Sequence, residues 1–257
     1  MRGLIRRGAL APWILTAVAG LGLACGGGVN DDPILRLSAE EAFAMGKKLM
    51  TDEKYDQARE HFAHAFQTAP NSEFGRDALL LQSDCYFEAG GEFNLIRAEA
   101  KYRDFNNRYP TSDRGDYVQS QIARSLEGRK RKPNRDQTET KKAIAAFEEL
   151  LALYPTSEYA EEAEAGIARL RVSLAEHEFG VARYQFRRGL LGASVNRLKY
   201  LVDNYPEYPE TDKALCMMGQ AMRRLKQTDE AQKIFEQLRT EYPQSTLCKS
   251  IPRGAAE

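Results

Sequence analysis

The chain has 257 residues, of which 42% are hydrophobic and 29% are charged, a composition typical of soluble globular proteins. Its 37 Lys and Arg residues balance its 37 Asp and Glu residues, so no net charge draws it toward nucleic acid. Beyond the N-terminal segment only three cysteines occur, too few and too scattered for a disulfide scaffold, and no CxxC pair is present.

The N-terminal segment, MRGLIRRGALAPWILTAVAGLGLACGGG, has the layout of an export signal. Three arginines and no acid precede an apolar run that is short for a stable membrane span. The small residues before Cys25 resemble a bacterial lipoprotein lipobox, although Gly22 stands where that pattern prefers Leu. We therefore predict a signal peptide over residues 1–24, a lipidated Cys25 and a flexible tether over residues 25–37. The alternative is an ordinary cleaved signal peptide.

Short phrases built on a proline recur along the rest of the chain: TAPNSEF, RYPTSDRG, LYPTSEYA, NYPEYPET and EYPQSTL. Proline has no N–H and biases the residue before it away from the α conformation, so each phrase is predicted to end a helix. A Ser, Thr or Asn directly afterwards can cap the next helix by accepting one of its free N–H groups. The phrases therefore predict alternating helices, and their number indicates an internal repeat.

Two of these repeats share one spacing pattern. A glycine, an alanine and a phenylalanine precede the proline, separated in both cases by 12, 4 and 8 residues. The residues are Gly46, Ala58, Phe62 and Pro70 in the first repeat, and Gly219, Ala231, Phe235 and Pro243 in the last. This is the pattern of the tetratricopeptide repeat, in which small residues let two helices approach and the aromatic ring fills the gap beside them. We predict an all-α superhelical solenoid of about five helix-turn-helix repeats.

The repeat spacings also predict the organisation of the chain. The ranges are 38–112 for repeats 1 and 2, 113–156 for repeat 3, 157–248 for repeats 4 and 5, and 249–257 for a C-terminal tail.

Repeat 3 is lengthened by a basic inserted loop, RKRKPNR, which runs from Arg129 to Arg135. One interpretation is a solvated loop with no role; the other is contact with anionic lipid headgroups or with an acidic partner surface. Asp136 and Glu139 follow the loop and are predicted to form a capping box at the start of the next helix.

Repeat 4 is predicted to begin with one long helix. No proline occurs between residues 157 and 188, and mostly apolar residues recur every three or four positions. These residues are Ala163, Ile167, Leu170, Leu174, His177, Val181 and Tyr184. Such spacing is typical of one face of a continuous helix, so residues 158–187 are predicted to form a single helix of about 45 Å. His177 is expected to be a satisfied core histidine and not a titrating switch.

Taken together, the lipoprotein signal and five repeats with YPxS boundaries resemble the BamD (ComL) family of outer-membrane protein assembly lipoproteins. The segments that carry the resemblance are QTAPNSEF, DRGDYV, RDQTETKKAIAAFEELLALYPTSEYAEEA and LAEHEFGVARYQFRRGLLGASVNRLKYLVDNYP. The resemblance implies an outer-membrane lipoprotein that faces the periplasm of a Gram-negative bacterium.

The partners that the resemblance implies are the β-barrel insertase and the other lipoproteins of the assembly complex, together with segments of unfolded outer-membrane proteins. The membrane is contacted through the lipid anchor, and no nucleic acid is expected. The alternative function is that of another periplasmic repeat lipoprotein, acting as an adaptor in cell-envelope or export machinery.

Two sets of binding residues are predicted. Phe43, Lys47 and Met50 occupy positions of the first repeat that face the concave side, where they would form a groove for the C-terminal segments of unfolded barrel proteins; the alternative is that they only pack the N-terminal end. Arg197 matches an Asn-Arg pair of the family and would bind a carboxylate on the insertase. Its alternative role is an intramolecular ion pair with Glu176 or Glu178.

No catalytic motif, phosphate-binding loop or zinc signature occurs in the sequence, so we expect no enzyme activity, no cofactor and no metal. His61 and His64 lie three residues apart but have no third ligand nearby in the sequence. Cys216 and Cys248 occupy nearly equivalent places one repeat apart. The sequence leaves open whether they form a disulfide, and packed thiols are the favoured interpretation.

Overall fold

The computed structural model describes residues 32–248, and within this range it contains ten α-helices, a short 3-10 helix and no strand. The 3-10 helix spans Pro33–Arg36. The α-helices are α1 (Ala39–Thr51), α2 (Tyr55–Thr68), α3 (Glu73–Ala89), α4 (Gly91–Arg108), α5 (Gly115–Glu127), α6 (Thr138–Leu153), α7 (Ala160–Arg187), α8 (Leu191–Asn204), α9 (Thr211–Arg224) and α10 (Thr228–Glu241).

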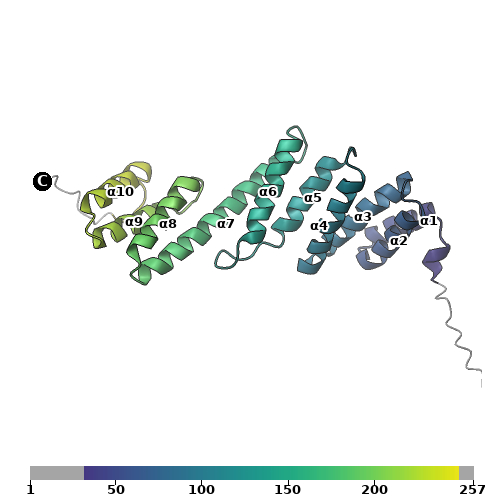
Figure 1. Cartoon of the computed structure of the whole chain (residues 1–257), viewed down its shortest axis with the longest axis horizontal. Helices are drawn as coiled ribbons and strands as arrows, with labels where there is room; N and C mark the ends of the chain where they lie inside the picture. The colour runs from purple at the N-terminus through teal and green to yellow at the C-terminus, as the bar shows by residue number, and fades with distance from the viewer. Residues whose placement is uncertain (1–31, 249–257) are drawn as a thin grey trace, which may run out of the picture.

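The helices follow one another along the long axis of the molecule, from α1 at one end to α10 at the other (Figure 1). Each helix packs mainly against the next helix in the chain. Stacked helix pairs of this kind are the architecture of repeat proteins, so the predicted all-α repeat fold is confirmed. Helices α1 to α4 lie within residues 38–112, α5 and α6 within 113–156, and α7 to α10 within 157–248.

The second helix of each pair ends two residues before a proline. The C-cap residues that stand between helix and proline are Ala69, Tyr109, Tyr154, Tyr205 and Tyr242, and each donates its N–H to the carbonyl four residues earlier. Since the next residue has no N–H to continue the helix, the helix stops there. The predicted helix ends are confirmed.

The predicted serine caps are only partly correct. Ser72 is the N-cap of α3, as expected. Ser112 and Ser157 instead accept hydrogen bonds from the N–H groups of Arg114 (3.2 Å) and Tyr159 (3.1 Å), two residues further on. Each of these serines therefore closes a turn, and α5 and α7 begin three residues after it.

Three glycines of the stack lie directly against an aromatic ring on a neighbouring helix. The pairs are Gly46 with Phe62, Gly166 with Phe147, and Gly219 with Phe235. A Cβ added to the glycine would lie 2.7 Å from a ring carbon in the first pair and 2.8 Å in the second, which is too close for a real side chain. The absence of a side chain thus sets how closely these helices pack.

The buried apolar residues form three clusters along the stack. The first joins α1, α2 and α3, the second runs from α3 to the first half of α7, and the third runs from the second half of α7 to α10. Leu170 belongs to the second cluster and Leu174 to the third. Helix α7 therefore connects the two larger cores.

Helix α7 is one unbroken helix of 28 residues, which confirms the predicted long helix. The predicted apolar face, however, is wrong beyond Leu174, because Tyr184 is 62% exposed. In its second half α7 packs against α8 and buries Ala175, Phe179 and Ala182 in place of the predicted positions. The buried face changes because the two halves of α7 contact different neighbours.

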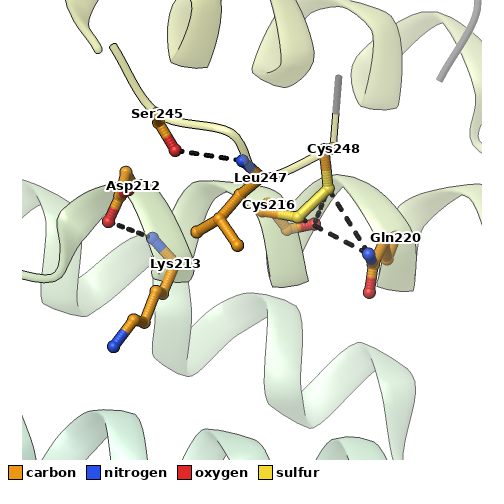
Figure 2. The surroundings of a disulfide bond; sticks show 7 residues. All are labelled: Asp212, Lys213, Cys216, Gln220, Ser245, Leu247 and Cys248. Atoms are coloured by element: carbon orange, nitrogen blue, oxygen red, sulfur yellow. Dashed lines mark hydrogen bonds between the residues drawn. A yellow bond between two sulfur atoms is a disulfide. The ribbon is translucent and has the colours of Figure 1, made fainter. Parts of the chain in front are cut away.

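A disulfide joins Cys216 on α9 to Cys248 beyond the end of α10, so the expectation of packed thiols is wrong. After α10 the chain turns back over α9 and brings the two Cα atoms to 5.9 Å, within the range of a disulfide. Figure 2 shows Leu247 beside this bond and Gln220, whose side-chain amide donates toward both sulfur atoms. Leu247 packs on the third core. Closing a loop of this length stabilises a fold by about 3–4 kcal/mol, so the bond holds the last helix pair together.

A buried carboxylate ties three helices of the second core together. Asp84 on α3 accepts hydrogen bonds from the hydroxyls of Tyr102 on α4 (2.6 Å) and Tyr117 on α5 (2.8 Å). Burial raises the pKa of Asp84 from its usual 3.8 to about 6, and the two hydroxyls partly oppose this rise because they stabilise the carboxylate.

This raised pKa predicts a pH-dependent difference between the wild type and the Asp84→Asn variant. Between pH 3.8 and about 6 the folded chain holds more protons at Asp84 than the unfolded chain, so its stability falls as the pH rises through this window. The amide keeps an acceptor for both hydroxyls without a buried charge. Urea unfolding should show the variant to be about 1–3 kcal/mol more stable than the wild type at pH 7, with a smaller difference at pH 4. A difference that does not change with pH would contradict the raised pKa.

Candidate partner-binding sites

The first predicted site lies where α1 meets α2 and α3. The ring of Phe43 is half-buried, with its centroid 5.9 Å from that of Phe62 on α2 and 5.7 Å from that of Phe74 on α3. The Lys47 ammonium lies 5.7 Å from the centre of the Phe43 ring and is exposed. Met50 is half-buried against the same core. The structure thus brings the three predicted residues to one face of α1 and adds Phe74, which the sequence analysis did not single out.

This arrangement combines an apolar surface with a cation. The half-buried Phe43 ring supports the packing of the first repeat, which agrees with the alternative interpretation of these residues. The exposed ammonium is nevertheless positioned to attract a carboxylate beside the exposed part of the ring. Both roles are compatible with the geometry, and binding by this face stays a prediction.

The second predicted site, around Arg197, lies where α7 meets α8. A guanidinium nitrogen, Nη1, of Arg197 donates to Oε2 of Glu178, so the intramolecular ion pair given as the alternative role is present. The Arg197 side chain is 37% exposed, whereas that of Glu178 is 16% exposed. A guanidinium has five N–H donors, and within the described residues the bond to Glu178 is the one hydrogen bond or ion pair of Arg197. The geometry therefore leaves donors of Arg197 facing outward.

An aromatic residue that the sequence analysis missed accompanies Arg197. Tyr200 follows it by three residues on α8, so the two side chains share one face of the helix, and Tyr200 is 48% exposed. Its ring packs edge-on against that of Tyr205 at 6.1 Å. A neighbouring arginine and tyrosine are typical of the residues that dominate protein interfaces. The spacing of three residues was the signal that could have identified Tyr200.

The basic inserted loop is partly structural. Arg129 is only 9% exposed, and its Nη2 lies 2.6 Å from a carboxylate oxygen of Glu99 on α4 and 2.5 Å from one of Glu139 on α6. A buried charge of this kind is tolerated because both carboxylates are bound to it. Arg131 pairs with Glu92 at the surface.

The predicted capping box of Asp136 and Glu139 is wrong. Gln137 is the N-cap residue of α6, with no side-chain cap, and Asp136 accepts hydrogen bonds from the N–H and the hydroxyl of Thr138. Glu139 is turned instead toward Arg129 and Lys142. A charged partner from outside the helix thus replaced the local backbone contact.

No candidate metal site emerges from the described range. Residues 32–248 contain no group of three or more His, Cys, Asp and Glu side chains placed to hold a metal ion. Nε2 of His64 lies 2.9 Å from the carbonyl of Leu37, and Nδ1 of His177 lies 2.6 Å from the carbonyl of Pro133. These two histidines therefore have backbone partners. His177 is satisfied as predicted, but it is half-buried and belongs to none of the three core clusters.

Two further findings concern the membrane. Cys25, the predicted lipidation site, lies outside the described residues. None of the helices in the described part of the chain combines the length and the apolar character needed to cross a bilayer.

Comparisons with known proteins agree with the resemblance drawn from the sequence. Outer membrane protein assembly factor BamD of Pasteurella multocida is 27% identical over 214 residues, which cover 76% of this chain and 77% of the relative. The protein of the same name from Rickettsia prowazekii is 27% identical over 239 residues, covering 90% and 92%.

Among solved structures, the type IV pilus biogenesis factor PilW matches 81% of this chain and 95% of its own, with 16% identity and a TM-score of 0.38, which adds nothing to the fold described above. The model of one family, YfiO, described as an outer membrane lipoprotein, matches residues 36–238. Because that match spans most of the sequence, the chain belongs to the YfiO family of outer membrane lipoproteins.

Proposed function

We propose that this protein is a non-catalytic scaffold for the assembly of outer-membrane proteins in a Gram-negative bacterium. Family membership and the names of its relatives, which are outer membrane protein assembly factors, support this role. In the proposal Cys25 carries the lipid anchor and the repeats face the periplasm. The partners are the β-barrel insertase, the other lipoproteins of the assembly complex and unfolded outer-membrane protein segments.

The observation that carries the proposal is the edge formed by α7 and α8. Arg197 is held in place by the less exposed Glu178 while part of its guanidinium remains at the surface beside Tyr200. Because the side chain is already fixed, binding a partner costs less conformational entropy. The planar guanidinium suits a carboxylate on the insertase. We assign this edge to insertase docking.

The concave face of the first repeat is assigned to the unfolded substrate. Phe43, Phe74 and Met50 supply apolar surface, and Lys47 supplies a cation above the Phe43 ring. A C-terminal peptide that ends in an aromatic residue offers the complementary groups, namely a ring and a terminal carboxylate. This assignment puts the substrate at the N-terminal end of the stack and the insertase in its C-terminal half, at α7 and α8 (Figure 1).

The docking role predicts different results for the two partners of the ion pair. Arg197→Leu should lower recovery of the insertase with the lipidated protein, purified from membranes, at least tenfold, because an interfacial charge contributes roughly 2–5 kcal/mol. Glu178→Gln should lower recovery far less, because it keeps the guanidinium and its amide oxygen can still accept a hydrogen bond from Arg197. Both variants should melt within a few degrees of the wild type, since an exposed ion pair contributes about 1 kcal/mol or less. Equal losses of recovery in both variants, or easy unfolding of Arg197→Leu followed by normal binding once folded, would make Arg197 structural.

The substrate assignment predicts a pattern of crosslinking. Photoreactive residues placed at positions 43 and 47 should capture C-terminal peptides of unfolded barrel proteins far more efficiently than the same residue at Glu149, an exposed position on α6. Peptides without the terminal aromatic residue should be captured less. If labelling at position 149 is as strong as at 43 and 47, the groove does not bind these peptides.

A further inference from the structure

A cleft lies between the basic inserted loop and the outer face of α7. Its volume is about 600 Å³, with Pro133 on the loop side and His177, Gly180, Val181 and Tyr184 along the helix. A second hollow of about 370 Å³ adjoins it, and the two share three lining residues from the loop and the helix. Together they form a groove along α7, which we call the loop cleft.

Gly180 is the feature of this cleft that the fold does not explain. A glycine inside a helix is destabilising relative to alanine. Gly166, on the same helix, has a packing reason, because the Phe147 ring lies against it. A Cβ added to Gly180 would meet nothing within 4 Å. The missing side chain therefore leaves open space at the cleft, where an outside group can approach the helix closely.

Basic side chains outnumber acidic ones in the walls of the loop cleft. Five Lys and Arg side chains, from the loop and from α7, line the larger cleft or the adjoining hollow. One acid, Glu176, lines the cleft and the hollow. Lys130, Lys132 and Arg183 have no ion-pair partner within the described residues. Each unpaired cation at the rim of an apolar cleft favours an anionic occupant.

The loop that forms one wall is held in a fixed position. Nδ1 of His177 donates to the carbonyl of Pro133 at 2.6 Å, and the side chain of Gln137 donates to the carbonyls of Lys132 and Arg135, both at 3.0 Å. Buried Arg129 anchors the start of the loop. The cleft therefore exists before an occupant arrives, and binding needs little ordering of the loop.

We propose that the loop cleft binds an extended segment of a partner protein in which acidic side chains flank an apolar or aromatic one. The apolar side chain enters the space over Gly180 beside Tyr184, and the carboxylates contact Lys132 and Arg183. A flat membrane surface cannot reach the bottom of such a cleft, which is why a peptide fits better than lipid headgroups.

This site goes beyond the proposed function and lies apart from the Arg197 edge. Residues 178 and 180 are separated by about 200° around a helix, so Glu178, which holds Arg197, and Gly180 lie on different faces of α7. The two surfaces can therefore be tested separately by substitutions in one helix.

The proposal is tested with the full-length protein in detergent and a set of fluorescent ten-residue peptides. The peptides alternate Asp or Glu with Phe, Leu and Pro, and a matched set carries Lys in place of each acid. Fluorescence anisotropy should show saturable binding of acidic peptides that weakens with salt, and no comparable binding of the basic set. Gly180→Leu fills the cleft and should weaken binding at least tenfold without lowering the melting temperature, because leucine favours the helix.

Two control variants separate the cleft from the rest of the surface. Gly192→Leu, at another open glycine on α8, should bind as the wild type does. The double variant Lys132→Ala, Arg183→Ala should lose binding as Gly180→Leu does. The proposal is overturned if no acidic peptide binds, or if Gly180→Leu binds them as well as the wild type does. It is also overturned if these cleft variants keep peptide binding but lose binding to phosphatidylglycerol vesicles. Loss of self-association in sedimentation, with peptide binding kept, would overturn it as well.

Discussion

The contact between a bare helix backbone and an aromatic ring is the constraint on which the stack depends. In the first and last repeats the ring belongs to the partner helix of the same pair, Phe62 against Gly46 and Phe235 against Gly219. Between repeats 3 and 4, Gly166 of α7 lies against Phe147 of α6. Because no side chain fits between backbone and ring, the helix spacing is set by the ring itself.

The position of α7 links this constraint to two of the candidate binding surfaces, the Arg197 edge and the loop cleft. Its first half is fixed against α6 through Gly166, and its second half packs on α8 in the third core. Glu178 then points to α8 and holds Arg197, while Gly180 opens toward the basic loop. A shift of α7 would therefore change the Arg197 edge and the loop cleft together.

Local patterns in the sequence were sufficient where neighbouring residues determine the structure. The residue before each proline ended a helix, and the apolar period gave one long α7. Apart from the serine caps, which failed locally, the predictions that were wrong involve partners outside the local segment. Arg129 drew Glu139 out of its capping box, and the returning segment after α10 brought Cys248 to Cys216. For the sites, repeat position suggested the face of Phe43, and the family resemblance suggested Arg197. Neither suggested the loop cleft, because its two walls are joined only in three dimensions.

The most direct test compares the two glycines of α7 by denaturant unfolding of the full chain. The account predicts that Gly166→Ala lowers the free energy of unfolding by roughly 1–3 kcal/mol, because the added methyl group overlaps the Phe147 ring. Gly180→Ala should raise it by about 0.5–1 kcal/mol, because the same methyl group meets nothing and alanine favours the helix. If Gly166→Ala stabilises the protein as much as Gly180→Ala does, the contact between backbone and ring does not set the packing of the stack.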